Sequence, residues 1–187
     1  MPSSSPSRRR ERLYWLAGVT VVVLTWATLK WARVVSNGLR DQGLLTATMA
    51  AIFVLAAALV VGFVVRQRPR AAELAVLAAF GVVYLAAILP LMGRPEEALH
   101  FVQYGLVGGL FYCALAERRR PAVAALGAFL LTVAAGWIDE GIQHLLPERV
   151  YDLRDVGFNA AAGALAIAAV ATRRRVRARA RLAHQLD

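Results

Sequence analysis

Six long apolar runs, separated by short polar breaks, constrain this chain more than any other feature of its sequence. A transmembrane helix needs about 20 predominantly apolar residues, and each run has roughly that length. The breaks at 66–70 and 117–121 carry proline and charge, which are typical of helix ends. The runs cover residues 13–29, 44–65, 71–92, 98–116, 122–142 and 156–172. This pattern predicts an all-α membrane protein, a bundle of six transmembrane helices that forms one domain.

The composition argues against a soluble globular protein. Of the 187 residues 59% are hydrophobic, whereas soluble domains are about 45–50% apolar. A net charge of +10 would suggest nucleic acid as the partner of a soluble protein. Here the basic residues lie between the apolar runs, so they are interpreted as orientation signals and no nucleic-acid partner is expected. The one cysteine, Cys113, excludes an intrachain disulfide and a cysteine-based metal site.

The basic residues are divided unevenly between the two ends of the predicted helices. If the chain starts in the cytoplasm and crosses six times, 16 of the 22 Lys and Arg lie on the cytoplasmic side with four acids. The other side then has six basic and eight acidic residues. Because cytoplasmic loops carry the excess of Lys and Arg, both termini are predicted to be cytoplasmic. The chain divides into a basic segment at 1–12, the transmembrane domain at 13–172 and a basic tail at 173–187.

Short local patterns add three expectations about the helices. The residues Ser-Asn-Gly at 36–38 predict a turn between the first two helices. Trp26 and Trp31 are expected at the outer end of the first helix, as interfacial aromatic residues. Gly105 and Gly109, with Gly108 beside them, have the spacing of small residues that lets transmembrane helices approach closely.

Polar residues gather at the ends of the last three apolar runs that face the extracytoplasmic side. Residues four apart lie on one helix face, so each run is expected to present a polar stripe. Acids near helix N-termini are partly explained by the helix dipole, but acids at a C-terminus are not. Because ionisable residues inside a membrane are costly, the stripes predict a functional site where the fourth, fifth and sixth helices pack together, with His100, Asp139 and Asn159 in one shared pocket. The candidates are Glu96, His100 and Tyr104; Asp139, Glu140 and Gln143; and Asp155 and Asn159.

The same region resembles a family. The segment EEALHFVQYGLVG at 96–108 is similar to the acid-x-x-x-His-Phe-x-x-Tyr segment of VanZ-like membrane proteins. The segment at 139–163 resembles their second signature, with Asp-Glu-x-x-Gln, Pro-x-Arg and Asp-x-x-x-Asn in order. Two positions depart from the family pattern: Glu97 stands where Lys is common, and Gly163 lies one residue later than usual. The resemblance implies an integral membrane protein associated with resistance to teicoplanin, a lipoglycopeptide antibiotic.

Two classes of function remain open. In the first, the protein recognises an amphiphilic cell-envelope molecule, membrane lipid or lipoglycopeptide antibiotic at the outer leaflet. Arg149 and Arg154 would contact an anionic head group, and the carboxylates would receive cationic or hydroxyl groups. In the second, the protein is a membrane-embedded hydrolase or transferase that acts on a cell-envelope lipid or cell-wall precursor.

The enzyme alternative has candidate residues but no recognisable motif. Glu96, His100, Asp139 or Glu140 would act as general base or bind a divalent cation. The sequence has no Gly-x-Ser-x-Gly, no His-Glu-x-x-His and no serine in its second half. Recognition is therefore favoured over catalysis, and a transporter is a weaker third option because transport sites tend to lie near the midplane. The sequence names no cofactor, no metal and no oligomeric state.

Overall fold

The computed structural model describes residues 6–146 and 152–186, and within them the secondary structure is entirely helical. Six α-helices are long and apolar enough to cross a membrane, which confirms the predicted all-α membrane bundle. A short 3-10 helix, η1, joins α3 to α4. Proline at the first turn begins both α4 and α5, where its missing N–H costs no hydrogen bond. The elements are α1 Pro6–Asp41, α2 Leu45–Arg66, α3 Ala71–Ile88, η1 Leu89–Gly93, α4 Pro95–Leu115, α5 Pro121–His144 and α6 Leu153–Leu186.

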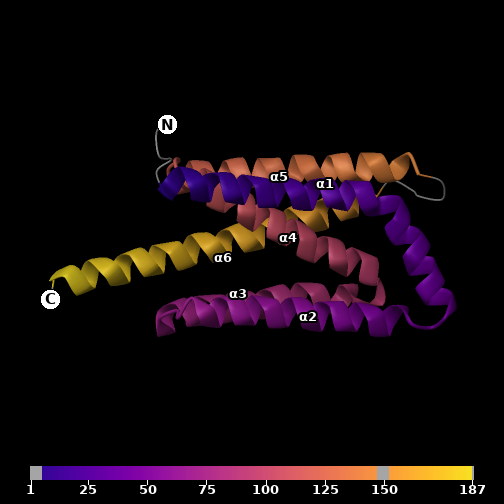
Figure 1. The fold of residues 1–187 in the computed structure, drawn as a ribbon, viewed down its shortest axis with the longest axis horizontal. Helices are drawn as coiled ribbons and strands as arrows, with labels where there is room; N and C mark the ends of the chain where they lie inside the picture. Colours follow the sequence, from indigo (N-terminus) through magenta and orange to yellow (C-terminus); the bar gives the residue numbers. More distant parts are fainter. Residues whose placement is uncertain (1–5, 147–151, 187) are drawn as a thin grey trace.

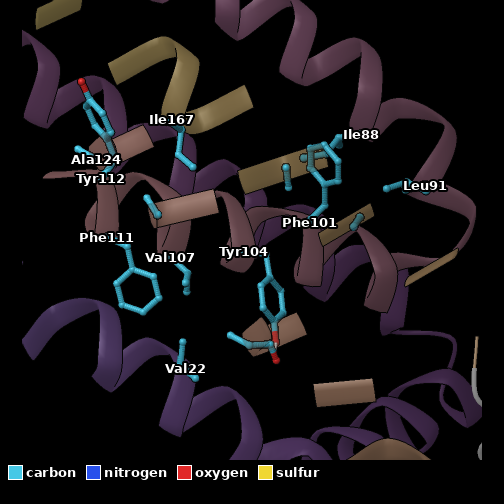
Figure 2. Close-up of a cluster of buried hydrophobic side chains, with 14 residues drawn as sticks. Val22, Ile88, Leu91, Phe101, Tyr104, Val107, Phe111, Tyr112, Ala124 and Ile167 are labelled. Carbon is cyan, nitrogen blue, oxygen red and sulfur yellow. Dashed lines mark hydrogen bonds between the residues drawn. The ribbon is translucent and has the colours of Figure 1, made fainter. Parts of the chain in front are cut away.

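Helix α4 lies at the centre of the bundle and packs against α1, α5 and α6 (Figure 1). It supplies six of the 14 residues of the buried apolar core, more than any other helix. Figure 2 shows Val107 and Phe111 facing Val22 of α1, whereas Phe101 lies towards Ile88 of α3. The expectation that the fourth, fifth and sixth helices pack together is thus confirmed.

Glycine allows the closest approach of α4, α5 and α6. A Cβ added at Gly108 would lie 2.8 Å from the Cα of Gly163 on α6. A Cβ added at Gly163 would lie 2.7 Å from Cγ2 of Thr132 on α5. The expected close contact on α4 therefore exists and is centred on Gly108, because a Cβ at Gly109 would meet atoms only at 4.0 Å. Gly163, which departs from the VanZ-like pattern, is the α6 residue that lies against Gly108 of α4.

The helix ends differ from several predicted boundaries. Helix α1 continues far beyond residue 29 and bends in its second half towards α2 (Figure 1). The turn predicted at 36–38 is wrong, because these residues stay helical and Arg40 donates a hydrogen bond to Asn37 within the helix. The chain turns at 42–44 instead, where Gly43 adopts a φ of +70° that favours glycine.

Two further boundaries also change. Helix α6 runs unbroken from the membrane domain through the segment predicted as a tail, to Leu186. Trp26 lies well inside α1 rather than at its end, and it packs against the hydrophobic core. Helix α1 continues for another 15 residues beyond Trp26, to Asp41, so Trp26 does not mark the end of the helix, and its place at a membrane interface stays a prediction.

The two ends of the bundle differ in what they hold. The N-terminus, the α2–α3 connection, the α4–α5 connection and the C-terminus lie at one end (Figure 1). The α1–α2 connection, η1, the end of α5 and the start of α6 lie at the opposite end. Alternation of this kind follows from six successive crossings. The two ends are called here the terminal end and the η1 end.

Candidate functional site

The η1 end gathers the start of α4, the end of α5 and the start of α6. The Nδ1 of His100 on α4 lies 3.2 Å from Oδ2 of Asp139 on α5. Gln143, one turn after Asp139, donates a hydrogen bond of 3.2 Å to the same oxygen. Asp139 is fully buried, whereas the His100 side chain is 20% exposed. Two helices therefore hold one carboxylate oxygen between an imidazole and an amide.

Tyr104 and Asn159 pack beside this group. The hydroxyl of Tyr104 donates a hydrogen bond of 3.1 Å to the carbonyl of Ala135, and its ring centroid lies 6.4 Å from that of His100. Asn159 of α6 is buried, and both Asn159 and Tyr104 lie against Gly136. A Cβ at Gly136 would come within 3.2 Å of the Asn159 Cβ, so this glycine lets the α6 amide approach α5.

Carboxylates crowd the same end of the bundle. Glu140 is buried and accepts a hydrogen bond of 2.8 Å from the backbone N–H of Asp152, just before α6. Asp152 in turn accepts one of 2.8 Å from the backbone N–H of Arg154. Asp155 is half-buried and lies within electrostatic reach of Glu140, Glu97, Asp152 and His100. These five acids and His100 are called the carboxylate–histidine cluster; its acids are Glu97, Asp139, Glu140, Asp152 and Asp155.

Two of the predicted site residues lie, in whole or in their side chain, outside the part of the chain that the structure describes. Arg149 lies outside the described residues, and so does the side chain of Glu96, although its backbone belongs to α4. Arg154 is exposed at the start of α6, and its backbone N–H donates a hydrogen bond to Asp152. The remaining predicted residues are those that the η1 end brings together.

The sequence reasoning missed three residues of this region. Glu97 was noted only as a departure from a family pattern, yet it pairs with Arg94 at 3.1 Å and its Oε2 is buried. Asp152 was passed over as part of a loop. Trp26 lies close to the Tyr104 hydroxyl through its indole N–H, without the geometry of a hydrogen bond. The sequence predicted Trp26 only as an interfacial aromatic residue, because its approach to Tyr104 depends on how α1 packs against α4.

The arrangement sets limits on the chemistry of the cluster. Among the described residues, no group of three or more His, Cys, Asp and Glu side chains is placed to hold a metal ion. Buried polar atoms usually have hydrogen-bond partners. Within the same residues the second oxygen of Asp139, Oδ1, is buried without one. The cluster thus offers an open acceptor on a fully buried carboxylate.

A second polar group closes the terminal end of the bundle. Glu73 on α3 is almost fully buried and accepts a hydrogen bond of 3.1 Å from Nε of Arg173 on α6. Arg173 also donates a hydrogen bond of 2.7 Å to Gln67. Glu117, after α4, lies 3.5 Å from Arg174 and 3.7 Å from Arg10. These contacts fix α6 to its neighbours at this end, which explains why the helix stays ordered beyond the membrane span.

No family model, no curated protein and no solved structure matches this chain. The resemblance to VanZ-like proteins therefore stays a prediction, and function is argued from the geometry of the η1 end.

Proposed function

We propose that this protein recognises the polar head group of an amphiphilic cell-envelope molecule at the outer leaflet, through the carboxylate–histidine cluster. The observation that carries the proposal is the fully buried Asp139, held by His100 and Gln143 with one oxygen still open. Ionisable groups at membrane depth are expensive, so such an arrangement favours a site over a packing role. The tail of the amphiphile would remain in lipid beside the bundle.

The placement at the outer leaflet rests on charge. The terminal end carries the arginines of 8–12, 66–70, 118–120 and 173–181, and the cluster lies at the opposite end. Under the positive-inside rule the terminal end is cytoplasmic and the η1 end is extracytoplasmic. Lipids, cell-wall precursors and lipoglycopeptides of the teicoplanin type meet a membrane from that side, in line with the function that the VanZ-like resemblance implies.

The test is to identify what the protein holds in its own membrane. The wild type, Asp139→Asn and Glu117→Gln are purified in mild detergent, and bound lipids are identified by mass spectrometry. We expect enrichment of one head-group class with the wild type and with Glu117→Gln, and loss of that enrichment with Asp139→Asn. Glu117 is the matched control, because it is an acid at the other end of the bundle. Identical lipid profiles for all three proteins would contradict the proposal.

A second candidate is a membrane-embedded hydrolase or transferase. One observation favours it: Asp139 contacts Nδ1 of His100 and leaves Nε2 as the ring nitrogen available to take a proton. A buried carboxylate that orients a histidine in this way is the usual support of a general base. The reaction would need water or a substrate hydroxyl as nucleophile. The Thr132 hydroxyl already donates to the Ala128 carbonyl, and Cys113 lies 13 residues along α4, about 20 Å from His100.

Recognition remains the better supported of the two. His100 is held by the Asp139 carboxylate, and Asp139 in turn accepts a hydrogen bond from the Gln143 amide. Binding needs only the open oxygen and the charge that are already in place. The two candidates differ sharply in what Asp139→Asn does, and that comparison is taken up in the Discussion.

A further inference from the structure

The carboxylate–histidine cluster is short of positive charge. It contains five acids, and the described bases at these ends of α4, α5 and α6 include His100, His144, Arg94 and Arg154. Both arginines are exposed, and Arg94 is 65% exposed even in its pair with Glu97. Like charges held close together in a medium of low dielectric repel strongly. A bound group that carries positive charge would relieve this repulsion.

Two buried oxygens of the cluster also lack donors. Within the described residues, Oδ1 of Asp139 and Oε2 of Glu97 are buried and have no hydrogen-bond partner. Asp139 is fully buried, so bulk water does not satisfy it. Leaving a buried charged acceptor unsatisfied carries the full desolvation cost of that group. Both open atoms are acceptors, so the missing partner is a hydrogen-bond donor.

We infer that the carboxylate–histidine cluster binds a protonated primary amine, the ammonium group of the ligand, at the open oxygen of Asp139. An ammonium group carries one positive charge and three N–H donors, which match the open oxygens and the excess of acids. The inference rests on the proposed function, because it names the chemical class that the same site recognises.

Two other ligand classes fit less well. An anionic phosphate at this position would meet five acids and would donate nothing to Asp139. A divalent cation requires several ligands that converge on one point, and the described His, Cys, Asp and Glu side chains provide no group of three that does so. A quaternary ammonium carries the charge but has no N–H to donate, so it serves as a chemical control.

The experiment measures binding of short-chain lipids to the purified full-length protein in detergent. Dihexanoyl phosphatidylethanolamine carries the ammonium group, its N-acetyl derivative lacks the charge, and dihexanoyl phosphatidylcholine keeps the charge without N–H donors. Loss of charge-assisted hydrogen bonds corresponds to about tenfold or more in Kd. We expect phosphatidylethanolamine to bind at least about tenfold more tightly than either analogue. Free ethanolamine, as a fourth probe, separates an amine held alone from one presented on a lipid.

Three variants locate the binding. Asp139→Asn and Asp155→Asn should each reduce the preference for phosphatidylethanolamine over its N-acetyl derivative, and Glu117→Gln should not. Asp155 is half-buried, so its variant provides the test if Asp139→Asn does not fold. Equal binding of the three lipids, with binding still lost in Asp139→Asn, would overturn the ammonium inference and leave the proposed function standing. If Glu117→Gln changes the head-group preference as much as Asp139→Asn does, both the ammonium inference and the proposed function are overturned.

Discussion

Replacing Gly108 with alanine should destabilise the bundle more than the same change at the next residue. The added Cβ would lie 2.8 Å from the Cα of Gly163, below the 3.4 Å at which ordinary contact begins. The obstacle is backbone, so it cannot rotate away, and α4 and α6 must separate. Overpacking of this kind costs about 1–3 kcal/mol. Gly109→Ala is the matched control, because its Cβ would meet Ala166 at 4.0 Å.

The two variants should therefore shift stability in opposite directions. Gly109→Ala gains helix propensity, which is about 0.5–1 kcal/mol at a site without steric conflict. Thermal unfolding in detergent is followed with a fluorogenic maleimide that reacts with Cys113, the one cysteine of the chain. We expect a lower Tm for Gly108→Ala and an unchanged or higher Tm for Gly109→Ala. Equal Tm values would refute the close contact of α4 and α6.

Three more predictions concern topology, charge and chemistry. Cysteines placed at Gln42 and Leu145, on a background without Cys113, should react with an impermeant thiol reagent in intact cells. A cysteine at Arg119 should react only after lysis, and the reverse pattern would invert the predicted orientation. Asp139→Asn should weaken ligand binding about tenfold if the site only binds, because a neutral group replaces a charged acceptor. A loss of about 10²–10⁴-fold in turnover, with ligand affinity intact, would instead favour catalysis. Glu73→Gln should lower the free energy of unfolding by about 1–3 kcal/mol, because it leaves the largely buried Arg173 without its charge partner. Denaturant unfolding measures this, and a change below about 0.5 kcal/mol would contradict the prediction.

A surface pair gives the scale against which Glu73→Gln is judged. Arg118 contacts Glu11 at the same end of the bundle, and its side chain is 58% exposed. Exposed ion pairs contribute about 0–1 kcal/mol, because water and salt screen them. Arg118→Gln should therefore change the free energy of unfolding by less than Glu73→Gln. If the two variants are equal, the burial of Glu73 does not carry the stability assigned to it.

The sequence was sufficient for the number of helices and for the proximity of His100 and Asp139. Each apolar run is long enough to cross a bilayer, and in lipid a run of this kind satisfies its backbone hydrogen bonds by forming a helix. The six helices therefore followed from the lengths of the runs. His100, Asp139 and Asn159 were expected to meet because each lies on a helix end at the same side of the membrane. Their contacts required only that α4, α5 and α6 be neighbours, which short connections favour.

Other features could not be derived from local patterns. The Ser-Asn-Gly segment at 36–38 is a common turn signal, but the actual turn follows Gly43. The burial of Glu73 depends on Arg173, 100 residues further along the chain. Trp26 approaches Tyr104 only because α1 packs against α4. Contacts between distant segments of this kind are set by tertiary packing, and no short motif encodes them.

The contact between His100 and Asp139 has a consequence for how the chain enters the membrane during synthesis. Both residues belong to the α4–α5 hairpin, whose helices are joined by the short segment 116–120. A carboxylate that entered lipid alone would oppose insertion by a few kcal/mol. Within the hairpin, Asp139 meets His100 and Gln143 before α6 has been translated. The polar residues of this hairpin thus enter lipid already in contact with one another, and α6, which follows in the chain, adds Asn159 and Asp155.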